Sequence, residues 1–197
     1  MTAHATPQKA SRREVFAGLA LAAWTLPVIA HAQAPVLASG GISWAPKALS
    51  LDQARALSAA CETIVPETDT PGAIAAGVPQ KIDGWIAGWM DPAAGERLKA
   101  GIDQLNERAR TRGAANFAAL TQDQKVALLS EIEGEQRAAD RQRPPVPHYW
   151  NTLKGLTTTA YFTSQAGATK AARYDPTPGA YRGCVPLKEI GRIWATT

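Results

Sequence analysis

The chain has 197 residues, of which 45% are hydrophobic and 7% aromatic, with 16 glycines and 14 prolines. This length and apolar content can supply the core of one domain without metal ions or many disulfides, and the composition favours small-residue helices over a β-sandwich. The formal net charge is +4, but residues 1–32 contribute +2 of it through Lys9, Arg12 and Arg13 against Glu14. The near-neutral remainder mixes acids with bases, which is typical of solvated helix faces and argues against nucleic acid as a partner.

The N-terminal segment has the features of an export signal. Arg12 and Arg13 follow Ser11, and an apolar run without charged residues extends from Val15 to Ala30, with Phe16 in the apolar position after the arginines. This arrangement closely resembles the twin-arginine signal, which exports proteins that have already folded. We therefore predict a twin-arginine signal peptide at residues 1–32 and a periplasmic location for the mature protein.

The end of this segment indicates where the signal is removed. Ala30 and Ala32 flank His31 in an arrangement that signal peptidase accepts, so that Gln33 becomes the first mature residue. The apolar run is short and rich in alanine compared with a membrane span of about 20 residues, and Pro27 also favours cleavage. Retention of the segment as a membrane anchor is the alternative.

The mature sequence predicts a mainly α protein, with an extended arm at residues 33–48 and a single compact helical domain at residues 49–197. Capping boxes at Ser50 and Thr121 and an Asp91-Pro92 start mark helix beginnings. Apolar residues at three- and four-residue spacing then indicate about five helices, at residues 51–65, 82–89, 92–112, 122–143 and 148–164. From about residue 166 the abundance of proline, glycine and aromatic residues predicts an irregular tail that packs against another surface.

Two glycines inside the second helix need an explanation. Gly84 and Gly88 lie four residues apart, and each costs a helix about 1 kcal/mol relative to alanine. We expect a close helix–helix crossing at this place.

The chain has two cysteines, Cys61 on an apolar helix face and Cys184 in the tail. In the oxidising periplasm they are natural partners for a disulfide that would tether the tail to the first helix. Two buried thiols, or one thiol bonded to a partner subunit, are the alternatives.

Motifs for cofactor chemistry are missing from the sequence. It contains no dinucleotide-binding glycine run, no phosphate-binding loop and no haem-attachment motif, so we expect no cofactor in this chain. His148 is the only histidine after residue 32, and a stand-alone enzyme would have to combine it with acids such as Glu67 or Asp69. A structural or interface role for His148 is favoured, and the chain is predicted to be non-catalytic.

Aromatic residues are the remaining candidates for binding. They could form a sugar-stacking platform, but the helical spacing of several favours packing in the core or at a subunit interface; they are Trp85, Trp89, Trp150, Trp194, Tyr161, Tyr174 and Tyr181. We expect the arm from Gln33 to Lys47 and the tail to contact a partner, the tail through Tyr174, Tyr181, Arg182 and Trp194.

Several of these segments together resemble the gluconate 2-dehydrogenase subunit 3 family. The resemblance lies in the twin-arginine start, the Ile64-Val65-Pro66 segment followed by Asp69 to Ala73, the Ala76-Gly77-Val78 step before Ile82-Asp83, and the closing run from Tyr174 to Pro186. It implies a small subunit of a flavin-dependent sugar or sugar-acid dehydrogenase, with FAD in a large catalytic subunit of the glucose–methanol–choline type and often a c-type cytochrome as electron acceptor.

The resemblance also implies a role. The small subunit would stabilise the catalytic subunit, help it to fold and supply the signal that the twin-arginine translocation machinery reads for both, and the complex could associate with the membrane. The competing hypothesis is a stand-alone periplasmic helical binding module or chaperone.

Overall fold

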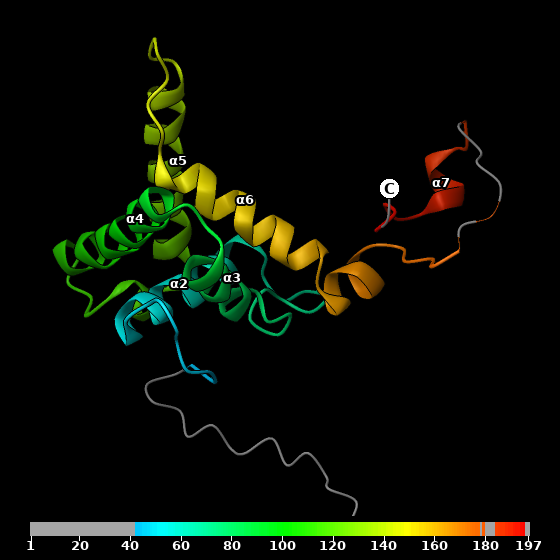
Figure 1. Ribbon diagram of the computed structural model, residues 1–197, viewed down its shortest axis with the longest axis horizontal. Coiled ribbons are helices and arrows are strands. Elements are labelled where there is room, and N and C mark those ends of the chain that lie inside the picture. The colour runs from blue at the N-terminus through cyan, green and yellow to red at the C-terminus, as the bar shows by residue number, and fades with distance from the viewer. Residues whose placement is uncertain (1–41, 178, 180–183, 196–197) are drawn as a thin grey trace, which may run out of the picture. The chain divides into compact units, whose positions relative to one another are not determined.

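The computed structural model describes residues 42–177, 179 and 184–195, which belong to one compact unit (Figure 1). The export-signal residues Ser11, Arg12, Arg13 and Phe16, the cleavage residues Ala30 and Ala32, and residues 33–41 of the arm lie outside the described residues. The described part is mainly α, as predicted, and its only β-pairing is an isolated bridge between Arg173 and Trp194.

Five helices of eleven or more residues form the domain, and all five were expected from the sequence. They are α2 (Leu51–Ile64), α3 (Val78–Gly88), α4 (Pro92–Thr111), α5 (Gln122–Asp140) and α6 (Tyr149–Phe162). Three short elements were not expected: the 3-10 turn η1 (Phe117–Ala119), the π-helical turn η2 (Gly167–Ala171) and the single turn α7 (Leu187–Ile190). The last two give the predicted irregular tail local helical structure.

The predicted helix starts are confirmed by their hydrogen bonds. The Gln53 N–H donates to Ser50 Oγ over 3.2 Å, and Gln53 Oε1 accepts the Ser50 N–H over 3.0 Å, so both halves of the capping box are present. Thr121 and Gln124 repeat this arrangement at the start of α5. At the start of α4 the Ala94 N–H donates to Asp91 Oδ1 over 2.9 Å. These side chains satisfy N–H groups that the first helical turn leaves without partners.

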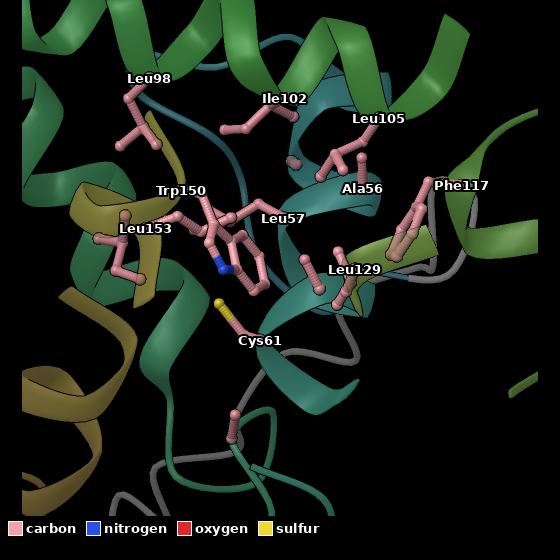
Figure 2. Close-up of a cluster of buried hydrophobic side chains, with 14 of the residues drawn as sticks. Ala56, Leu57, Cys61, Leu98, Ile102, Leu105, Phe117, Leu129, Trp150 and Leu153 are labelled. Atoms are coloured by element: carbon pink, nitrogen blue, oxygen red, sulfur yellow. The ribbon is translucent and has the colours of Figure 1, made fainter. Parts of the chain in front are cut away.

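Helix α2 lies at the centre of the domain and contacts α3, α4, α5, α6 and η1. Its inward face presents Leu57 and Cys61, both fully buried (Figure 2). The same hydrophobic cluster contains side chains of neighbouring elements, among them Leu98, Ile102 and Leu105 of α4, Phe117 of η1, Leu129 of α5, and Trp150 and Leu153 of α6. The three- and four-residue spacing of apolar residues therefore identified most of this core correctly.

The expected close crossing at Gly84 and Gly88 is wrong. A Cβ atom added at either glycine would meet no other atom within 4 Å, so neither glycine makes room for a neighbouring element. The close approaches occur instead at Gly101, where a Cβ would overlap the ring of Tyr149, and at Gly167, where it would overlap the carbonyl of Tyr161. The α4–α6 contact and the α6–η2 turn therefore depend on glycine, whereas α3 does not.

The apolar stripe of α3 is also only partly buried. Ile82 is fully buried and Trp85 is half-buried, but Trp89, in the C-cap position after the last residue of the helix, is 67% exposed. The sequence favoured packing of these aromatic residues in the core or at a subunit interface. The C-terminal end of the stripe presents an aromatic side chain at the surface.

Candidate interaction surfaces

The first candidate region is the contact between the arm and helix α3. Asp83 of α3 is 1% exposed, and its carboxylate accepts three consecutive backbone N–H groups, from Lys47 over 2.7 Å, Ala48 over 3.0 Å and Leu49 over 3.1 Å. Ile42 is 5% exposed and belongs to the hydrophobic core. Residues 42–48 of the arm are therefore bound to their own domain by one buried carboxylate and by apolar side chains.

The apolar spacing of the sequence did not mark this anchor. Asp83 is a lone acid beside Ile82, the buried residue that begins the apolar stripe of α3. Successive residues of a helix point about 100° apart, so the burial of Ile82 does not predict the burial of Asp83. Once buried, a carboxylate needs either a counter-ion or several hydrogen-bond donors.

The second surface is an aromatic corner at the C-terminal end of α3, formed by Lys81, Trp85 and Trp89. The two indole rings meet edge to face with centroids 5.5 Å apart, and Lys81 Nζ lies 5.4 Å from the Trp85 centroid. Lys81 Nζ also donates to Thr163 Oγ1 over 2.8 Å, which joins α3 to the end of α6. Trp85 is thus held in place, and Trp89 is the exposed member of the pair.

The third surface is the C-terminal hook, by which we mean the described residues 167–177, 179 and 184–195. Its two ends are joined by a short parallel bridge, in which the Arg173 N–H donates to the Ile193 carbonyl over 2.8 Å and the Ala195 N–H donates to the Arg173 carbonyl over 2.9 Å. The Arg173 guanidinium lies 4.5 Å from the centroid of the Trp194 ring. Backbone hydrogen bonds and the contact between the arginine and the tryptophan ring both join the two segments, so the described part of the hook has a defined conformation.

The hook exposes large apolar side chains on both of its bridged segments. Tyr174 is 51% exposed, Ile193 60% and Trp194 36%. Of the four tail residues expected to contact a partner, Tyr174 and Trp194 are therefore at the surface, whereas Tyr181 and Arg182 lie outside the described residues. Ile193 was not among the expected residues, because the tail lacks the periodicity that would have marked it.

Two open grooves lie elsewhere on the domain. The larger, of about 540 Å³, is lined by Ser58 and Ala59 of α2 and by side chains from the arm, η1 and α5, including Ile42, Ala119 and Lys125. The smaller, of about 490 Å³, lies between the start of α2 and α4 and carries the acids Asp52, Asp103 and Glu107.

The two cysteines are both free thiols in the structure. Cys61 is fully buried, its Sγ lies 3.4 Å from Thr157 Oγ1, and burial raises its pKa to about 12. Cys184 is exposed. The structure does not show the proposed disulfide, and Cys61 fits the alternative of a buried thiol that packs like a small apolar side chain.

His148 has a structural role in the described fold. It is the N-cap of α6, where its Nδ1 accepts the Trp150 N–H over 3.2 Å, and its ring stacks on Tyr149. Of the acids that a histidine-based enzyme would have needed, Asp69 accepts from the Thr68 hydroxyl, and the backbone N–H of Glu67 donates to the Glu62 carboxylate. The hydrogen bonds in the structure therefore do not join these three residues into a catalytic group.

Ion pairs connect the outer helices. Arg108 of α4 forms a bidentate pair with Glu135 of α5, with both N–O distances 2.7 Å, and this hydrogen bonding lowers the pKa of Glu135 and raises that of Arg108. Arg137 and Lys154 lower the pKa of Glu133 in the same way. These side chains are partly exposed, so water screens them and each pair contributes only modestly.

Among the described residues, no group of three or more histidine, cysteine, aspartate or glutamate side chains is placed to hold a metal ion. The described helices also include none with the length and apolar character needed to cross a membrane.

These features define a mainly helical domain with open grooves and exposed aromatic side chains. The family model of gluconate 2-dehydrogenase subunit 3 matches residues 51–179, which is more than half of the chain, and the chain belongs to this family. The match starts at the first residue of α2 and includes all five long helices, so it confirms the resemblance noted in the sequence. No curated protein matches the chain, and no solved structure matches it.

Proposed function

We propose that this chain is the non-catalytic small subunit of a periplasmic, flavin-dependent sugar or sugar-acid dehydrogenase of the gluconate or glycoside type. It stabilises a large FAD-bearing catalytic subunit of the glucose–methanol–choline type, and a c-type cytochrome completes the complex. The observation that carries the proposal is the family match over residues 51–179, because subunit 3 of a dehydrogenase acts together with other chains.

Features of the chain itself support an accessory role. The sequence has no motif for a flavin, a nucleotide or a haem, and its single histidine after residue 32 caps a helix. The aromatic corner and the C-terminal hook expose large apolar side chains, the kind of residue that contributes most of the binding energy in protein interfaces. The FAD and the reacting groups would then belong to the partner.

Export is the second part of the proposal. The paired Arg12 and Arg13 before an uncharged apolar run supply a twin-arginine signal, and this route carries proteins that have folded beforehand. A catalytic subunit that has bound FAD and this chain in the cytoplasm could cross the membrane without a signal of its own. The subunit therefore escorts its partner as well as stabilising it.

Co-purification tests the accessory role. This chain, tagged at its C-terminus, is co-expressed with a flavoprotein of the glucose–methanol–choline type from the same organism, and the captured material is examined by absorption spectrum and by dehydrogenase activity on sugars with an artificial acceptor. We expect a yellow complex with activity. A colourless monomer that captures no flavoprotein would overturn the accessory role and favour the stand-alone binding module or chaperone.

A second experiment tests the escort role. Arg12→Lys together with Arg13→Lys is expected to leave both subunits in the cytoplasm, whereas Lys9→Gln, which removes a charge outside the arginine pair, serves as the control. The measurement is the dehydrogenase activity in the periplasmic fraction. Unchanged periplasmic activity in the double variant would show that the partner is exported independently.

A further inference from the structure

The C-terminal hook holds the positive charge of the chain that follows the signal segment. Residues 33–166 contain 13 basic and 14 acidic residues, a net charge of −1. Residues 167–195 have a net charge of +3, from Lys170, Arg173, Arg182, Lys188 and Arg192 against Asp175 and Glu189. A short C-terminal segment therefore carries the net positive charge of a domain that is otherwise close to neutral.

These bases lie at the surface of the described part of the hook, where the Arg173 guanidinium also stacks on Trp194 and the Arg192 guanidinium donates to the Lys170 carbonyl. Lys170, Arg173, Lys188 and Arg192 are all exposed, and none forms an ion pair with another described residue. The bases of α4 and α5 differ in this respect, because several of them pair with neighbouring acids. Unpaired, exposed bases are available to attract an acidic surface.

Apolar side chains lie among these bases. The bridge places Arg173 opposite Trp194, with Tyr174 and Ile193 as their neighbours in sequence, and all four are exposed. Exposed apolar side chains surrounded by charged ones have the composition of a protein interface, with an apolar centre and a polar rim. The prebuilt bridge also lowers the entropy lost when the hook is fixed in a complex.

We propose that the C-terminal hook is a docking element that binds an acidic surface patch on the FAD-bearing catalytic subunit. Its bases would steer association, and Tyr174, Ile193 and Trp194 would form the apolar centre of the contact. This inference rests on the proposed function for the identity of the partner. It does not follow from the family, since the family match ends at residue 179 and leaves out Lys188, Ile193 and Trp194.

A protein surface fits the hook better than a lipid surface. Binding in the plane of a membrane usually employs a long amphipathic helix, whereas the only α-helix in the described part of the hook, α7, has four residues. The exposed apolar side chains lie instead on a bridged, extended segment with an arginine stacked on the tryptophan ring. A surface with this fixed arrangement of side chains is suited to one partner of complementary shape and charge.

A competition experiment tests the inference in the full chain. Wild-type and variant chains with different tags are co-expressed with the catalytic subunit, and the share of flavoprotein that each captures is measured. Ile193→Ser with Tyr174→Ala leaves the Arg173–Trp194 stacking intact and is expected to lower the captured share about 30-fold, as for a hot spot of about 2 kcal/mol. Val126→Ser, at a side chain of α5 that is 48% exposed, is the matched control.

Charge is tested separately. Lys170→Glu with Lys188→Glu is expected to slow association with the purified catalytic subunit about tenfold at low ionic strength, and the difference should shrink as salt is added. Arg97→Glu with Lys125→Glu makes the same change in net charge on α4 and α5 and should have little effect.

The outcomes separate the two proposals. If the wild-type chain captures flavoprotein and the hook variants capture it equally well, the docking role of the hook is overturned while the accessory role stands. The same conclusion follows if the hook variants lose binding only to vesicles of anionic lipid. If the wild-type chain captures no flavoprotein, the accessory role itself fails, and the assignment of the partner fails with it.

Discussion

The carboxylate of Asp83 on α3 accepts the backbone N–H of Leu49, just before α2, over 3.1 Å. The same carboxylate accepts the N–H groups of Lys47 and Ala48, so three successive donors take the place of a counter-ion. An extended segment normally finds its hydrogen-bond partners in a neighbouring strand. Here a helix side chain supplies the acceptors, and the end of the arm is fixed without a sheet.

Removal of this carboxylate should release the arm. Asp83→Ala leaves N–H groups without acceptors, one of them buried, and should lower the free energy of unfolding by about 3 kcal/mol, whereas Asp83→Asn keeps one acceptor oxygen and should lower it less. Urea unfolding measures the change, and hydrogen exchange at Leu49 reports on the arm itself. Asp123→Ala, at an exposed acid of α5, is the control. Equal losses for Asp83→Ala and Asp123→Ala would contradict the anchoring role.

The sequence predicted those parts of the fold that depend on local rules. Ser50 and Thr121 cap helices because their hydroxyl groups accept nearby N–H groups, and the spacing of Leu98, Ile102 and Leu105 places them on one face of α4. These features involve residues close together in the chain. They can therefore be read without knowing where the other helices lie.

The features that were missed depend on contacts between distant residues. Asp83 binds residues 34 to 36 positions away, and Arg173 pairs with residues about 20 positions further along the chain. Glycine carries no side-chain pattern, so the sequence could not show that Gly101, and not Gly84, lies against another element. Of the tail residues expected to bind a partner, Tyr174 and Trp194 are exposed, but the bridge that brings Ile193 beside them could not be foreseen.

The two kinds of glycine should respond in opposite ways to alanine. At Gly84 an added Cβ meets nothing within 4 Å, so Gly84→Ala should stabilise the protein by about 0.5 to 1 kcal/mol through the higher helix propensity of alanine. At Gly101 the Cβ would overlap the Tyr149 ring, so Gly101→Ala should destabilise it by about 1 to 3 kcal/mol. Thermal unfolding of both variants decides the matter, and a stabilised Gly101→Ala variant would show that the α4–α6 contact is looser than described.

The cysteines should differ in reactivity. Cys184 is exposed, so one equivalent of a maleimide should react with the native protein at neutral pH. Burial excludes the reagent from Cys61 and raises its pKa to about 12, so its thiol should react only after unfolding. Mass spectrometry without reductant counts the labels, and the Cys184→Ser variant should take none in the native state. A protein that takes no label even when unfolded would instead contain a Cys61–Cys184 disulfide.

The ion pair between Arg108 and Glu135 should make part of the stability depend on pH. The hydrogen bonds from Arg108 lower the pKa of Glu135, so the native state holds this proton less tightly than the unfolded state. The resulting stability is present above the unfolded pKa of about 4.3 and is lost as the pH falls through the lower folded value. Because both side chains are partly exposed, Glu135→Gln should cost no more than about 1 kcal/mol at neutral pH.

Unfolding measurements at acidic pH therefore distinguish the contribution of the charge to stability from that of side-chain packing. Urea unfolding of wild type and Glu135→Gln should differ at pH 7 and converge once Glu135 is protonated in both states, well below pH 4. Glu96→Gln removes the same charge from a pair with Lys99 within α4 and should change the stability by only a few tenths of a kcal/mol. A difference for Glu135→Gln that persists unchanged into acid would mean that the side chain stabilises the α4–α5 contact by packing, and that its charge contributes nothing.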